Sequence, residues 1–148
     1  MGKYGEKAKG LFVDGYNCAQ AVFGAFSDVT GIDFETSVKL SSGFGGGMGR
    51  MREVCGAVSG MFMVLDAVEG YTSPTDNTAK MKLYAKVQKL AESFKEKNGS
   101  IICRELISDG SAISPIPTER TPEFYKKRPC GELVEIAADI IAEYLGVN

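Results

Sequence analysis

Apolar side chains recur with a helical period through most of this chain, and almost no segment alternates with the two-residue period of a half-buried strand. In the longest such segment, Leu83, Val87, Leu90 and Phe94 fall on one face, while lysines and glutamates fill the other. The chain has 148 residues, so we expect a single domain over residues 1–148. The pattern predicts an all-α fold, a compact bundle of about five to six helices.

Capping residues and glycines set the expected helix boundaries. A connection at residues 111–129 carries four of the five prolines and is expected to be irregular. The predicted helices run from about Gly15–Asn17 to Phe26, briefly after Asp33, over 51–69, from Asp76 or Asn77 to about Lys97, over 102–108, and from about Gly131 to Leu145.

A glycine-rich segment, GFGGGMGR at residues 43–50, precedes the predicted central helix. Five glycines in eight residues predict a loop that needs positive φ angles or close backbone approach. The loop is either a tight connection between packed helices or a nest of amides for an anion, a thiolate or a cluster sulfur. In the second case Gly45, Gly46 and Gly47 would contact the cofactor.

The chain contains no histidine. This excludes hydrolase triads that use imidazole as the base, histidine-ligated haem and mixed Cys/His zinc fingers. Thiols, carboxylates, amines, phenols or a bound cofactor must therefore carry any chemistry.

Charge and hydropathy limit the location and the partners. Seventeen basic and nineteen acidic residues give a net charge of −2 with both signs scattered, which disfavours a nucleic-acid partner or membrane insertion. No secretory signal is evident at the N-terminus, and no apolar segment is long enough to span a membrane. We expect a cytoplasmic protein, in which cysteines serve redox or metal chemistry before structural disulfides.

Four cysteines share one kind of position, in the opening turns of predicted helices: Cys18, Cys55, Cys103 and Cys130. Helix N-terminal amides and the helix dipole favour a thiolate and lower its pKa. Nearby arginines would add to this, and Arg104 is a candidate cofactor contact. We predict that the four thiols converge at one end of the bundle. The structural alternative is that they are small buried apolar residues.

The segments around these cysteines resemble one family. The ordered set GYNCAQAV, GFGGGMGR, VCGAVSGMF, GSIICREL and KRPCGELV is similar to the C_GCAxxG_C_C proteins, described as redox-active, with CGAxxG at residues 55–60. The resemblance implies that the four cysteines are the functional set, as redox thiols or as metal ligands.

Three functions are compatible with these residues. The cysteines could bind an iron-sulfur cluster or another metal for electron transfer. They could instead perform thiol-disulfide exchange without metal, with Cys55 as the attacking thiol and an unidentified redox partner. The third alternative is a zinc-stabilised or structural helical interaction module. In the first two cases the protein would be an oxidoreductase or an electron-transfer protein, and a homo-oligomer is compatible with each.

Overall fold

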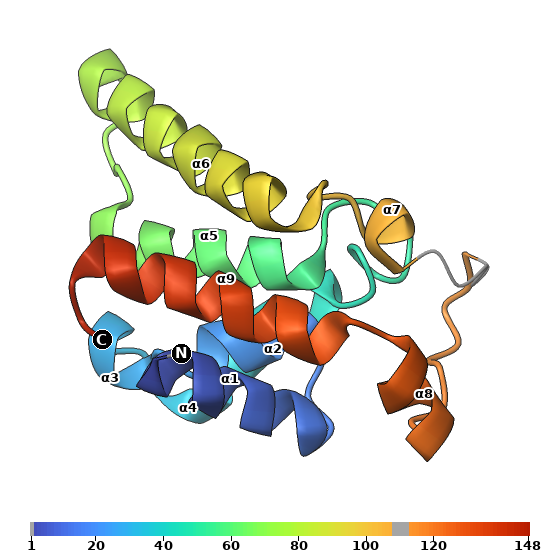
Figure 1. Ribbon diagram of the computed structural model, residues 1–148. Coiled ribbons are helices and arrows are strands. Elements are labelled where there is room, and N and C mark those ends of the chain that lie inside the picture. Colours follow the sequence, from blue (N-terminus) through green and yellow to red (C-terminus); the bar gives the residue numbers. More distant parts are fainter. Residues whose placement is uncertain (1, 108–112) are drawn as a thin grey trace.

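The computed structural model describes residues 2–107 and 113–148, and the described ranges are helical without a regular strand (Figure 1). The prediction of an all-α fold is confirmed, and six helices in these ranges have seven residues or more. The elements are α1 (Lys3–Val13), α2 (Cys18–Gly24), α3 (Ser27–Thr30), α4 (Phe34–Ser41), a 3-10 turn (Ser42–Phe44), α5 (Gly56–Glu69), α6 (Asn77–Asn98), α7 (Cys103–Ile107), α8 (Pro122–Lys127) and α9 (Cys130–Leu145).

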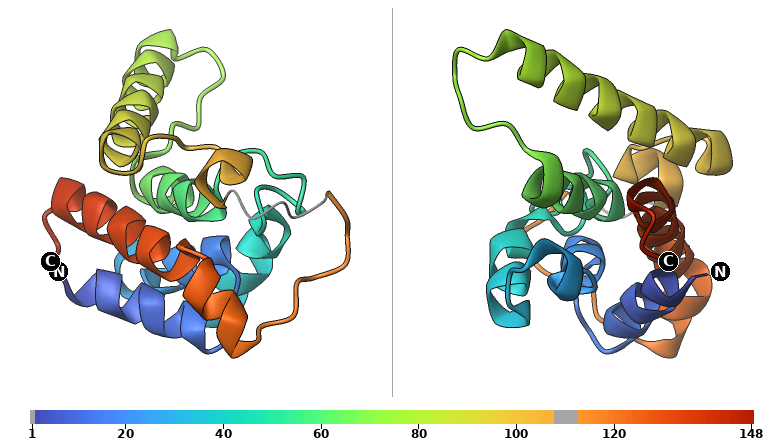
Figure 2. Two further views of the ribbon diagram at one scale, coloured as in Figure 1. Left: turned by 45° about the vertical axis from the view of Figure 1, so that its right-hand side comes forward. Right: turned by 90° about the vertical axis from the view of Figure 1, so that its left-hand side faces the viewer.

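Helices α5 and α9 lie side by side at the centre of the molecule (Figures 1 and 2). Helix α1 packs along α9, α2 packs against α5 and α4, and α6 lies across the outer side of α5 and α9. The two ends of the chain are neighbours, and the side chain of Asn148 lies against Gly2. The Gly2 amide also donates to Asp139 Oδ1 of α9 at 3.1 Å. The central position of α5 agrees with its sequence, which is apolar on nearly all sides.

Several predicted helix boundaries are confirmed by their caps. Asn17 and Gln20 form a capping box at the start of α2, in which each side chain accepts from the other residue's amide. Asp33 and Asp76 accept from amides of the first turns of α4 and α6. Gly99 ends α6 in the left-handed conformation.

The central helix begins at Gly56, five residues later than expected. Residues 51–55 instead run beside the segment before α7, and Val54 and Ile102 form an isolated antiparallel bridge. The sequence of 51–55 could not reveal this, because a five-residue segment of mixed apolar and charged residues shows neither a helical nor a strand period.

Three helices were not expected from the sequence: the four-residue α3, α1 and α8. Three glycines interrupt the N-terminal segment, yet α1 forms there because Tyr4, Ala8 and Phe12 are buried along one face. Helix α8 forms inside the proline-rich connection, where Thr121 caps it and Pro122 occupies its first turn. Of the predicted segments, residues 108, 111 and 112 lie outside the described ranges.

Within the described ranges, no helix is both long enough and apolar enough to cross a membrane.

Candidate functional site: a thiol pocket at four helix starts

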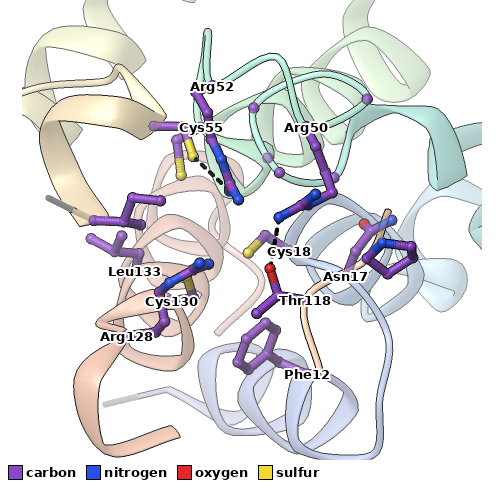
Figure 3. Close-up of a pocket in the computed structure, with 18 of the residues that line it drawn as sticks. Phe12, Asn17, Cys18, Arg50, Arg52, Cys55, Thr118, Arg128, Cys130 and Leu133 are labelled. Atoms are coloured by element: carbon purple, nitrogen blue, oxygen red, sulfur yellow. Dashed lines mark hydrogen bonds between the residues drawn. The ribbon is translucent and has the colours of Figure 1, made fainter. Parts of the chain in front are cut away.

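The four cysteines all lie at helix starts, as predicted. Cys18, Cys103 and Cys130 are the first residues of α2, α7 and α9, and Cys55 immediately precedes α5. All four line one pocket of about 430 Å³ (Figure 3). The structure therefore brings together residues that are up to 112 positions apart in the chain (130 − 18).

Cys18 and Cys130 are interacting thiols at the starts of α2 and α9. The interaction with Cys18 is the largest of the causes that lower the pKa of Cys130 from 9.0 to about 7. The guanidinium groups of Arg128 and Arg120 stabilise the same thiolate. The pKa of Cys18 is raised well above its ordinary value, first by its interaction with Cys130 and then by burial. The first proton lost from the pair therefore leaves a thiolate at Cys130.

Cys55 and Cys103 are brought together by the backbone bridge described above. The Cys55 amide donates to the Ile101 carbonyl at 2.8 Å, and the Cys103 amide donates to the Glu53 carbonyl at 2.6 Å. Burial raises the pKa of Cys55 to about 12, and it also raises that of Cys103, against the opposing effect of Arg52. Both of these thiols are protonated at neutral pH.

The expectation of a lowered pKa at each helix start is wrong at three of the four cysteines. At Cys55 the amides of Ala57 and Val58 do lower the pKa, but removal of the sulfur from water has the larger, opposite effect. The prediction of Cys55 as the attacking thiol loses its physical basis, and Cys130 has the lowest thiol pKa among the described residues.

The four thiols share one pocket, but they are not grouped as metal ligands. Among the residues that the structure describes, no three cysteine, aspartate or glutamate side chains are placed to hold one metal ion. A four-coordinate thiolate site needs all of its ligands about 2.3 Å from the metal. The thiols of the described residues are therefore not placed as the ligands of a four-coordinate metal site.

The glycine loop forms one wall of the pocket, and Gly45, Gly46 and Gly47 all line it. A Cβ on Gly47 would lie 2.7 Å from Cys103 Cβ, and one on Gly45 would lie 2.5 Å from Asn17 Cγ. Gly46 and Gly47 also have φ angles of 65° and 73°. These contacts support the tight-connection interpretation of the loop. A contact of the three glycines with a cofactor stays a prediction.

Arg104 does not lie among the described residues that line the pocket. Its Nε donates to the Arg52 carbonyl at 2.9 Å, and its Nη2 pairs with Glu53 Oε1 at 2.6 Å. The predicted role of Arg104 as a cofactor contact is therefore not supported, and the side chain holds the backbone at Arg52 instead.

Four arginines line the pocket: Arg50, Arg52, Arg120 and Arg128. Arg50 fastens the proline-rich segment by donating to the carbonyls of Ser114 and Ile116 and to Thr118 Oγ1 (Figure 3). Arg120 donates to the carbonyls of Phe12 and Tyr16, at 2.5 and 2.7 Å.

The role of Arg120 was missed at the sequence level. It lies in an irregular connection without periodicity, and its contacts are with residues more than one hundred positions away. The only sequence feature that could have pointed to this role was an arginine within a proline-rich segment.

The comparisons with known proteins agree with the cysteine pattern. Residues 16–144 match the family model described as "Putative redox-active protein (C_GCAxxG_C_C)". No curated protein and no solved structure matches the chain significantly. Because the match covers most of the chain, the protein belongs to the C_GCAxxG_C_C family.

Proposed function

We propose that the protein is a thiol-disulfide oxidoreductase in which Cys130 is the attacking thiolate and Cys18 is the resolving thiol. The observation that carries the proposal is that these two thiols line one pocket and interact there, with the pKa of Cys130 lowered and that of Cys18 raised. Disulfide exchange needs a thiolate with a second thiol in contact, and the lowered pKa of Cys130 supports the assignment of the two roles.

The reaction begins with attack of the Cys130 thiolate on one sulfur of a disulfide substrate. The substrate S–S bond breaks, a mixed disulfide forms on Cys130, and the first substrate thiolate leaves and takes up a proton. Cys18 then loses its proton and attacks the Cys130 sulfur, which releases the second substrate half as a thiol. Two electrons pass to the substrate, and a Cys18–Cys130 disulfide remains. A dithiol reductant, the redox partner in the cytoplasm, returns the pair to its reduced form.

The missing imidazole base is compatible with this chemistry. The positive charges of Arg128 and Arg120 and the interaction with Cys18 stabilise the thiolate directly. Exchange at neutral pH therefore requires no separate base for the first step. Cys55 and Cys103 do not attack the substrate in this first step, because burial keeps both thiols protonated.

Trapping of the mixed disulfide tests the assignment. In Cys18→Ser the hydroxyl still interacts with Cys130, but no resolving thiol remains, so incubation with oxidised glutathione should leave one glutathione on Cys130. Intact mass and peptide mapping measure the adduct. Cys55→Ser is the matched control and should accumulate no adduct, as in the wild type. An adduct on Cys55 or Cys103, or none at all in Cys18→Ser, would sink the proposal.

Binding of an iron-sulfur cluster, zinc or another metal is the second candidate. It is supported by one observation, that four cysteines line a single pocket, because four thiolates are the usual complement of a cluster. The interaction of Cys18 with Cys130, without a three-ligand group among the described residues, favours exchange. Anaerobic reconstitution with iron and sulfide separates the two, since only the cluster candidate predicts colour and stoichiometric iron that depend on all four cysteines.

A further inference from the structure

Arg52 is the least expected charged residue of the pocket, because it is buried. Only 3% of its surface is exposed. Its Nη1 lies 3.8 Å from Cys103 Sγ, and in the described part of the chain neither Nε nor Nη2 has a hydrogen-bond partner. A buried guanidinium with unpaired donors is strongly unfavourable unless a ligand completes it.

The two unpaired nitrogens share one edge of the guanidinium plane. Nε–H and the N–H of Nη2 point in parallel, which is the fork that binds two oxygens of a carboxylate, phosphate or sulfo group. In Figure 3 the side chain of Arg52 extends from the glycine loop into the pocket, toward the level of Cys18. Arg52 lines the pocket, but Nε and Nη2 are themselves buried, so a ligand in the space that the thiols line reaches this edge when the side chain turns toward that space.

The backbone holds Arg52 in this position at a conformational cost. Its φ angle is 61°, in the left-handed region that non-glycine residues rarely adopt. The Arg52 amide donates to the Gly46 carbonyl at 3.2 Å, and its carbonyl accepts from Arg104 Nε. A strained residue fixed on both sides of its peptide unit is typical of a preorganised functional site.

The charge of the pocket agrees with an anionic ligand. Its described lining residues include four arginines but no aspartate or glutamate. Apolar side chains, Phe12, Phe124 and Leu133 among them, form another part of the lining. The pocket thus combines a cationic wall with an apolar wall, within about 430 Å³.

We infer that this pocket binds a small oxyanion, which accepts two parallel hydrogen bonds from Nε and Nη2 of Arg52. Binding itself does not require thiol exchange. The same site could also anchor the disulfide substrate, and this second role rests on the proposed function. The substrate would then carry a carboxylate, phosphate or sulfo group beside its reacting sulfur.

Thermal unfolding with two probes, sodium sulfate and sodium benzoate, tests the site at an ionic strength held constant with sodium chloride. A ligand that binds only the folded state raises the midpoint, and above its Kd the rise grows with the logarithm of the ligand concentration. We expect such a rise for one or both probes in the wild type, and a loss of about tenfold or more in apparent affinity in Arg52→Met. Benzoate alone would indicate a carboxylate ligand, and sulfate alone would indicate a tetrahedral one.

Matched variants make the outcome specific. Lys39→Gln removes one exposed charge outside the pocket lining and should retain the full rise. Arg52→Lys keeps the charge without the fork and should also bind weakly, which provides a second variant if Arg52→Met does not fold.

Equal rises in the wild type and both Arg52 variants, or no rise for either probe in the wild type, would overturn the inference. The Cys18→Ser, Cys130→Ser double variant should still bind, so failure of the exchange mechanism is distinguishable from failure of the anion site.

Discussion

At the scale of single residues, position at a helix start does not by itself make a cysteine reactive. The amides of Ala57 and Val58 at the start of α5 lower the pKa of Cys55, yet burial has the larger effect and raises it to about 12. Cys130 is also buried, but a neighbouring thiol and two arginines lower its pKa to about 7. The difference lies in the polar partners of each sulfur, because desolvation acts against both thiolates.

This contrast predicts a distinct pH profile for Cys130. Its iodoacetamide alkylation rate should rise with a midpoint near pH 7, since the thiolate forms as pH passes through a pKa that lies below the ordinary 9.0. Cys18→Ala removes the principal cause of the lowering, so the midpoint should move upward toward 9. Rates followed by peptide mass spectrometry measure both profiles. Cys55→Ala is the control and should leave the midpoint unchanged, and a wild-type midpoint near 9 would refute the assignment.

At the scale of elements, the caps and the glycine loop place the thiols. The capping box fixes the start of α2, and Asn17 Nδ2 also donates to the Ser42 carbonyl at 3.0 Å. A Cβ on Gly56 would lie 3.1 Å from Cys18 Cβ, so a side chain at this position would push the starts of α5 and α2 apart by a few tenths of an ångström. Local structure at these helix starts thus controls the distances between reactive groups.

The caps Asn17 and Asp76 offer a matched test of the link between helix capping and the position of the thiols. Asn17→Ala and Asp76→Ala should each lower the free energy of unfolding by about 1 kcal/mol, measured by urea denaturation. Only Asn17→Ala should also raise the Cys130 alkylation midpoint, because α2 carries Cys18 while α6 carries no cysteine. If both variants shift the midpoint, or neither does, the capping box does not position the thiol pair.

At the scale of the whole molecule, helical periodicity predicted most of the fold. Leu83, Leu90 and Phe94 of the predicted stripe are buried, Val87 is half-buried, and Asp76 caps the helix where the sequence suggests. Helix α1 escaped prediction because its glycines serve packing: a Cβ on Gly5 would lie 2.3 Å from Asp139 Oδ1 of α9. Such an approach between distant segments leaves no periodic signal in the chain.

The sequence predicted which cysteines form the candidate site, but it did not predict which of them interact with each other. Helix starts could be recognised at each cysteine, so convergence of the thiols was a reasonable expectation. Pairing of Cys18 with Cys130 depends on how α2 packs against α9, and burial of Arg52 depends on contacts between the glycine loop and the segment before α7. These are tertiary relations, which capping and periodicity do not encode.

The central claim is that Cys18 and Cys130 are the exchanging pair, and disulfide mapping of the oxidised wild-type protein tests it most directly. The reduced protein would be titrated with oxidised glutathione, quenched with acid, alkylated and digested for mass spectrometry without reduction. The account predicts loss of two thiols together and a Cys18–Cys130 disulfide as the first product, with Cys55 and Cys103 still alkylated as free thiols. A Cys55–Cys103 disulfide forming first, or four thiols that resist oxidation, would contradict the account.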